Sequence, residues 1–323
     1  MIRRWAGTVA TLVFALIIVI PSGFRIAAAW RETADASELA PATGRYVEVR
    51  SGRMFVQEAG PPDGMPVVLF HGTAAWSEFW RRTTSALAAE GFRVIALDIP
   101  PFGFSDRPRD HAYSRAAQAE RVHDVLDRLE IGKAMLVGHS FGAGATVETV
   151  LRYPERIAGL VLVDAALGLS ADAGSSLPLY LRPHWTREIA ASLTVTNPLA
   201  TRTLLSMMIA KKEGADDENV AILQRPIALR NTTREMATWL GYFMSADSGA
   251  WSADRARYAT IAAPTAIIWG NEDTVTPVAQ AEDLRSLIPG ATLTLLPHLG
   301  HIPHIEDPDA FNRALIERLR ALM

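Results

Sequence analysis

The sequence predicts an α/β protein: a mostly parallel central sheet flanked by helices, with one helical insertion. Short, wholly apolar segments alternate with segments of helical periodicity, which is the pattern of buried parallel strands joined by helices. The alternation stops between residues 165 and 258 and returns afterwards. A length of 323 residues is sufficient for one large domain that carries such an insertion.

The first strands are expected as a hairpin. Residues 46–49 and 54–58 alternate between apolar and polar side chains on either side of the turn residues Ser51 and Gly52. The strands after it are short and apolar throughout, as in a sheet covered on both faces. They span residues 67–70, 94–97, 134–137, 160–163, 265–269 and 293–296. Helical spacing predicts helices over residues 77–90, 114–129, 143–152 and 308–322.

The insertion, residues 165–258, contains helix-like segments and no convincing strand, and we expect it to lie over the sheet. Its helical segments span residues 186–191, 201–211 and 233–243. The insertion divides the α/β core into a first part, residues 45–164, and a second part, residues 259–323. Residues 31–44 are polar and contain alanine and proline, which is typical of a linker.

Residues 1–30 are expected to lie apart from this fold. Residues 5–24 carry no charge, and Arg25 ends the stretch. A helix of that length spans about 30 Å, the thickness of the hydrocarbon layer, and the basic residues before it favour a cytoplasmic N-terminus. The sequence thus favours a membrane anchor; the alternatives are a cleaved signal peptide, with small residues at 27–29 as its cleavage site, and a buried soluble helix. Anchor and signal peptide both place the folded part of the chain outside the cytoplasm.

The composition excludes several classes of function. A net charge of −3 without a long basic run argues against a nucleic-acid partner, because phosphates favour a basic face. The absence of cysteine excludes disulfides, thiolate zinc sites and a cysteine nucleophile, and it leaves the redox compartment open. No segment predicts a cofactor, and the sequence leaves the oligomeric state open.

The segment Gly138-His139-Ser140-Phe141-Gly142 follows an apolar strand and precedes a helix. This G-x-S-x-G pattern is typical of a nucleophile elbow, a tight turn that holds the serine in a strained backbone conformation. Glycines two residues before and after the serine avoid side-chain clashes, and the helix N-terminus directs free N–H groups at it. Ser140 is therefore the candidate nucleophile.

A serine hydroxyl needs a base to activate it, and the base needs an orienting acid. In an open parallel sheet such groups lie at the carboxyl ends of the strands. Asp273, in the loop after the strand at 265–269, is the candidate acid. Its neighbour Glu272 stays open as an alternative, and Asp164, which also ends a strand, is the reserve.

Three of the eight histidines, His298, His301 and His304, lie within seven residues after the last strand. No second cluster of carboxylates and histidines with ligand spacing accompanies them in the sequence, which argues against a metal site. His301 follows Gly300, which gives the backbone room to reach over the sheet edge, and it is the candidate base. His298 and His304 are expected to serve as nearby hydrogen-bond partners.

The negative charge that develops during acyl transfer needs two N–H donors, an oxyanion hole. Phe141, directly after the candidate nucleophile, is expected to supply one of them. The other is expected in the loop after the strand at 67–70, from Thr73, with Ala74 as the reserve. His71 in the same loop is expected to have a structural hydrogen-bonding role.

Together these motifs resemble the α/β-hydrolase fold family, in the branch of serine esterases, meta-cleavage-product hydrolases and cofactor-free haloperoxidases or perhydrolases. The matching segments are Phe70-His71-Gly72, Leu97-Asp98-Ile99-Pro100, Gly103-Phe104-Ser105-Asp106, Gly138-His139-Ser140-Phe141-Gly142, Gly270…Asp273…Pro277 and Gly300-His301…His304-Ile305-Glu306. The resemblance implies Ser140, Asp273 and His301 as nucleophile, acid and base, and a cap formed by the insertion. Dehalogenases and epoxide hydrolases of the family use an aspartate nucleophile, so a serine at this position disfavours those activities.

The sequence thus predicts a serine hydrolase that forms an acyl-enzyme on Ser140, with a small-to-medium apolar carboxylic ester as the expected substrate. The cap offers an adaptable apolar set for specificity. It comprises Met207, Met208, Met236, Trp239, Tyr242, Phe243 and Met244. A carbon–carbon bond hydrolase of the meta-cleavage-product type and a perhydrolase are the enzyme alternatives, because they need the same triad. A membrane-tethered binding protein on a hydrolase scaffold is the non-enzyme alternative.

Overall fold

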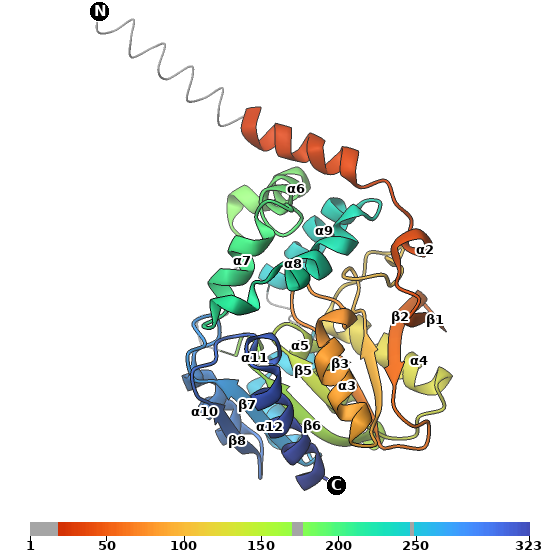
Figure 1. The fold of residues 1–323 in the computed structure, drawn as a ribbon, viewed down its shortest axis with the longest axis vertical. Coiled ribbons are helices and arrows are strands. Elements are labelled where there is room, and N and C mark those ends of the chain that lie inside the picture. Colours follow the sequence, from red (N-terminus) through yellow and green to blue (C-terminus); the bar gives the residue numbers. More distant parts are fainter. Residues whose placement is uncertain (1–18, 170–176, 246–248) are drawn as a thin grey trace, which may run out of the picture.

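The computed structural model describes residues 19–169, 177–245 and 249–323, and it contains an eight-stranded sheet covered by helices (Figure 1). The strands are β1 (Gly44–Val49), β2 (Gly52–Ala59), β3 (Pro66–Phe70), β4 (Arg93–Leu97), β5 (Ala134–His139), β6 (Ile157–Val163), β7 (Thr265–Gly270) and β8 (Thr292–Leu296). Their order in the sheet is β1-β2-β4-β3-β5-β6-β7-β8. β2 pairs antiparallel with β1 and with β4, and all other neighbours pair parallel. The predicted hairpin and mostly parallel sheet are confirmed.

The central strands are apolar throughout because helices cover both faces of the sheet. Successive side chains of β3 point to opposite faces: Val67 and Leu69 pack into one hydrophobic cluster, and Val68 and Phe70 pack into another. Every residue of β5 and of β7 is buried. This two-sided burial explains why the sequence shows continuous apolar runs instead of an alternating pattern.

The helices that flank the sheet each pack an apolar face against it. They are α3 (Arg81–Ala89), α4 (Arg115–Arg128), α5 (Gly142–Arg152), α10 (Val278–Leu287) and α12 (Pro308–Ala321), with the short α11 (Pro303–Glu306) before the last. α4, α5 and α10 pack on one face of the sheet, and α3 and α12 pack on the other. The α4 N-terminus is capped by the Ser114 hydroxyl, which accepts a hydrogen bond from the N–H of Ala117. The sequence patterns had not indicated α10.

Four helices between β6 and β7 form what we call the helical layer, which covers one end of the sheet (Figure 1). They are α6 (His184–Leu193), α7 (Thr201–Met208), α8 (Asp217–Gln224) and α9 (Thr232–Met244). Helical segments were expected at α6, α7 and α9. α8 was missed because its apolar residues, 220–223, are consecutive and do not recur at helical spacing.

The N-terminal region contacts the helical layer. The described part of its helix, residues 19–31, is followed by α2 (Ala36–Leu39), and Ala34 forms an isolated β-bridge with Leu229. Most of the anchor segment expected at 5–24 lies outside the described residues. Among the residues that the structure describes, none of the helices combines the length and the apolar character needed to cross a membrane.

We predict that Gly270→Ala destabilises the protein by about 1–3 kcal/mol, because it overpacks a close backbone contact. A Cβ atom on Gly270 would overlap the carbonyl oxygens of Leu299 and Gly300, which lie on the loop after β8. Gly132→Ala is the matched control, since a Cβ there meets open space. Urea unfolding of the two variants measures the difference, and equal midpoints would contradict the prediction.

Candidate active site

Ser140 lies in the turn between β5 and α5, with its backbone in the left-handed region at φ = 50°. Its N–H donates to the carbonyl of Val163 at 3.0 Å, which ties the turn to the neighbouring strand β6. A Cβ atom at Gly138 would overlap the side chain of Thr146, and one at Gly142 would overlap the carbonyl of His71. The strained turn expected from the sequence is present, and these contacts are the reason for its two glycines.

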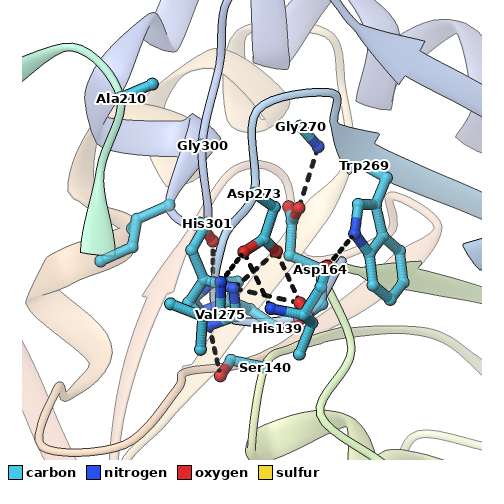
Figure 2. A network of polar contacts seen from close by, with 12 residues as sticks. His139, Ser140, Asp164, Ala210, Trp269, Gly270, Asp273, Val275, Gly300 and His301 are labelled. Atoms are coloured by element: carbon cyan, nitrogen blue, oxygen red, sulfur yellow. Dashed lines mark hydrogen bonds and ion pairs between the residues drawn. The ribbon is translucent and has the colours of Figure 1, made fainter. Parts of the chain in front are cut away.

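Three side chains from distant parts of the chain meet at this turn (Figure 2). His301, in the loop after β8, places its Nε2 2.8 Å from the Oγ of Ser140. Its Nδ1 lies 2.8 Å from Oδ2 of Asp273, in the loop after β7. The structure thus brings the three residues singled out in the sequence into one continuous line of hydrogen bonds.

The Asp273 carboxylate is held by a second set of donors. The N–H groups of Val275 and Thr276 donate to its Oδ1 at 2.7 and 2.9 Å, and the Thr276 hydroxyl donates to its Oδ2 at 2.5 Å. Burial by itself raises the pKa of Asp273, but the hydrogen bonds from His301 and Thr276 outweigh burial and hold the pKa below its usual value. The group is therefore ionised at neutral pH and can hold the imidazole with its Nδ1–H toward the carboxylate.

His301 is also held through its backbone. Its N–H donates to the carbonyl of Met208 at the end of α7, at 3.1 Å. Its carbonyl oxygen lies 2.8 Å from Nε2 of His139, the residue before Ser140. Burial lowers the pKa of His139 to about 3, so this ring is neutral and donates from Nε2.

Glu306 is a residue whose function the sequence analysis did not identify. Its buried carboxylate accepts hydrogen bonds from the N–H groups of Gly300 and Ile302, which flank the histidine, at 2.9 and 3.1 Å. It also accepts from the N–H groups of Ala210 and Lys211 of the segment after α7, at 2.8 and 3.0 Å. In the sequence, only its place in the Gly300…Glu306 motif marked Glu306 as a residue of the site. That motif does not indicate the hydrogen bonds from Ala210 and Lys211.

Asp164, the reserve acid, lies at the end of β6 and is fully buried, at φ = 43°. Its Oδ1 accepts the N–H of Gly270 at 2.9 Å, whereas its Oδ2 has no partner at hydrogen-bond distance. Burial and then the nearby Asp273 charge raise the pKa of Asp164 well above its usual value. This shift disfavours the ionised form that would stabilise an imidazolium, so Asp273 is better suited than Asp164 to orient His301.

The same residues do not fit a metal ion. In the described chain, one group of three or more histidine, aspartate or glutamate residues has ligand atoms within 4.8 Å of one another. It consists of Asp164, Asp273 and His301. Both ring nitrogens of His301 are already engaged, one with a carboxylate and one with the Ser140 hydroxyl. A cation would have to break this line of hydrogen bonds to find a ligand.

His71 is fully engaged in the loop after β3. Its Nδ1 lies 2.8 Å from the carbonyl of Gly72, and its Nε2 accepts the N–H of Ile99 at 2.9 Å. Burial lowers its pKa to about 4. The ring is thus a neutral structural bridge between two loops, which agrees with the role expected for it.

The other two histidines of the C-terminal cluster lie apart from the Ser140 hydroxyl. His298 is exposed, with its Nδ1 3.2 Å from a carboxylate oxygen of Glu272. Glu272 is half exposed and contacts His298, whereas the carboxylate that contacts His301 is that of Asp273. His304 is buried and stacks on Trp80 at 4.1 Å between ring centroids, and burial keeps its pKa well below the usual value.

The two backbone N–H groups that the sequence predicts as oxyanion donors belong to Phe141 and Thr73. Phe141 is the first residue after Ser140 and the N-cap of α5, and Thr73 lies in the loop after β3 at the cavity wall. Among the described residues, neither N–H group donates to a protein acceptor. Ala74, the reserve, has a left-handed backbone at φ = 59°.

A cavity of about 450 Å³ lies between the Ser140 turn and the helical layer. Its lining is overwhelmingly apolar. The residues are Gly72, Thr73, Ala74, Ala75, Phe79, His139, Ser140, Val195, Thr201, Leu204, Leu205, Met207, Met208, Leu223, Ile227, Thr274, Val275 and Ile302. The described lining therefore contains no arginine, lysine, aspartate or glutamate, and the cavity suits an uncharged group attached to a reactive carbonyl.

Comparison with known proteins identifies the family. The alpha/beta hydrolase fold model matches residues 65–308, and the chain belongs to that family. It is 30% identical to an uncharacterized protein of Mycobacterium tuberculosis, over 87% of this chain and 82% of that protein. It is 29% identical to a 2-hydroxymuconate semialdehyde hydrolase of Pseudomonas sp. (86% and 94% covered). Among solved structures, a meta-cleavage product hydrolase from Pseudomonas fluorescens IP01 is 28% identical, with a TM-score of 0.69 over 87% of this chain and 99% of that one.

We predict that Asp164→Asn changes how stability depends on pH. A carboxyl whose pKa is raised by folding contributes stability below its unfolded pKa of about 4, and this contribution is lost as the pH rises toward the folded pKa. Above pH ~4.5, the free energy of unfolding of the variant minus that of the parent should therefore increase by about 1.4 kcal/mol for each pH unit. Urea unfolding at several pH values up to neutrality measures this, and parallel curves would contradict it.

Proposed function

We propose that this protein is a serine hydrolase in which Ser140 attacks a substrate carbonyl carbon. His301 takes the hydroxyl proton at Nε2 as the Ser140 Oγ bonds to the carbonyl. Asp273 holds the imidazole in the required tautomer and stabilises its positive charge. The observation that carries this proposal is the continuous hydrogen-bond line from Asp273 through His301 to Ser140.

The tetrahedral intermediate needs donors for its oxyanion. We assign this role to the free N–H groups of Phe141 and Thr73. The protonated His301 then gives its proton to the leaving alcohol, which departs and leaves an acyl group on Ser140. A water molecule, deprotonated by the same histidine, attacks the acyl carbon and releases the carboxylic acid and the free serine.

The proposed substrate is a small-to-medium apolar carboxylic ester, with the helical layer acting as the cap. An apolar cavity over the Ser140 hydroxyl supports this choice. Of the apolar cap residues that were expected to set specificity, Met207 and Met208 line the cavity. Trp239 instead packs against Phe102 and Phe141, with ring centroids 4.9 and 5.1 Å away, and so helps to hold the layer on the core.

A carbon–carbon bond hydrolase is the second candidate, because the similar proteins include a 2-hydroxymuconate semialdehyde hydrolase and a meta-cleavage product hydrolase. A muconate semialdehyde carries a carboxylate as well as a reactive carbonyl. The described cavity lining offers no cation to pair with that charge, and burying an unpaired carboxylate is costly. This is why we place the ester first. A perhydrolase would use the same three residues and is a further outcome of a substrate panel.

We predict that Ser140→Ala loses nearly all turnover of p-nitrophenyl butyrate and all labelling by a fluorophosphonate probe. The variant lacks the nucleophile, while its fold should persist because alanine retains the Cβ atom. Ser286→Ala, at an exposed position outside the site, is the matched control and should keep both properties. Turnover by the Ser140 variant at the parent rate would sink the assignment, and a well-folded, unlabelled, inactive parent would favour a binding protein.

The same panel should include a ring-cleavage dienoate and peracid formation from hydrogen peroxide. We expect the ester to be the preferred substrate of the parent protein. Faster turnover of the dienoate would replace the ester by the second candidate and leave the Ser140 mechanism intact.

A further prediction distinguishes the roles of the two buried aspartates in turnover. Asp273→Asn should lower kcat for the ester by about 10³–10⁴-fold, because the amide cannot stabilise the imidazolium. Asp164→Asn should stay within about tenfold of the parent, because an amide replaces a carboxyl that is already uncharged. Steady-state kinetics measure both, and equal losses would show that Asp164 shares the role of the acid.

We further propose that residues 1–30 direct the folded part of the chain across the membrane, as an anchor through residues 5–24 or as a cleaved signal peptide. The uncharged stretch behind two arginines supports this. N-terminal sequencing of the protein from cell fractions should find it outside the cytoplasm, intact at residue 1 or cut near residue 29. A soluble, intact cytoplasmic protein would refute the proposal.

A further inference from the structure

The described part of the N-terminal helix, residues 19–31, has an unusual orientation of its side chains. Both of its arginines turn toward the helical layer. Nε of Arg25 lies 2.7 Å from a carboxylate oxygen of Glu188 in α6, and Arg31 donates to the carbonyl of Thr196 at 2.7 Å. Ala28, between them, is 1% exposed. The polar side of this helix is therefore the side that faces the protein.

The apolar side of the helix faces away from the protein. Val19, Ile20, Ile26 and Trp30 are 64, 49, 52 and 81% exposed, and none of the exposed positions from 19 to 30 carries a charge. A surface helix of a soluble protein shows the opposite arrangement, with charged residues outward and an apolar stripe toward the core. The outward side of this helix therefore suits an apolar environment.

The neighbouring segment of the helical layer shows the same character. Leu179, Tyr180 and Trp185, just before α6 and in its first turn, are 76, 71 and 65% exposed. α6 is the helix that Arg25 contacts through Glu188, and Figure 1 shows it next to the N-terminal helix at the end of the molecule away from the sheet. We call Leu179, Tyr180 and Trp185, together with Ile20, Ile26 and Trp30, the apolar end face.

We propose that the apolar end face docks on a lipid bilayer, with the helix at residues 19–31 lying in the membrane–water interface. The chain enters this helix from residues 5–18, which carry no charge, so an apolar sequence leads directly to the face. Tryptophan and tyrosine are the residues enriched at membrane interfaces, and helices that lie in the interface bury an apolar side. The helical layer would then face the lipid and the sheet the solvent. This proposal concerns the uncleaved chain, because a cut near residue 29 would remove Ile20 and Ile26. It does not depend on the activity assigned to Ser140.

The absence of native cysteine permits a direct test with full-length protein. Ile26→Cys and Trp30→Cys each receive an environment-sensitive nitrobenzoxadiazole dye, and Leu295→Cys on β8 is the control, because it is also an exposed apolar position, at 42%. Each protein is mixed with vesicles of phosphatidylcholine and phosphatidylglycerol. Thermal unfolding of each labelled variant without vesicles checks that the fold is kept.

We expect the dyes at 26 and 30 to shift their emission to shorter wavelength, to be quenched by lipids with doxyl-labelled chains, and to be protected from aqueous iodide. The dye at 295 should show none of these changes. Two results would overturn the proposal. In the first, vesicle-bound protein leaves the dyes at 26 and 30 as open to iodide as the control. In the second, the shift occurs without vesicles and grows with protein concentration, which would identify a second copy of the chain as the cover.

Discussion

The hydrogen bonds of the Glu306 carboxylate are the constraint on which the geometry of the site depends. One carboxylate joins the backbone on both sides of His301 to the segment that follows α7. Hydrogen bonds to a carboxylate are stronger than hydrogen bonds between neutral groups. Loss of this carboxylate would leave four backbone N–H groups without their acceptor. The same carboxylate therefore joins the loop that carries His301 to the segment after α7, and the residues just before that segment, Met207 and Met208, line the cavity.

The surroundings of the two buried aspartates, which follow neighbouring strands, shift their pKa values in opposite directions. Asp273 has donors on both of its oxygens, and its pKa is held below the usual value, whereas Asp164 has a donor on one oxygen, and its pKa is raised well above the usual value. Two like charges so close together would repel each other in a region of low dielectric constant. The opposite pKa shifts thus favour the negative charge on Asp273, which contacts His301.

The helical layer has two apolar surfaces with different consequences. Its inner surface forms part of the cavity wall, and in the proposed function that surface would select an apolar acyl group. Its outer surface, with the N-terminal helix, exposes large apolar side chains that protein does not cover, among them Trp30 and Trp185. If the proposed function and the proposed docking both hold, the cavity lies close to a bilayer, where apolar esters concentrate, and the sheet end of the molecule faces water.

The sequence by itself determined the α/β class, the strand positions and three residues of the site, because each rests on a local signal. Two-sided burial makes β3 and β5 continuous apolar runs, and the turn at Ser140 needs glycines at fixed offsets. What only the tertiary structure decided involves partners far apart in the chain. The four donors of Glu306, the raised pKa of Asp164 and the inward turn of Arg25 depend on contacts between segments that no local pattern connects.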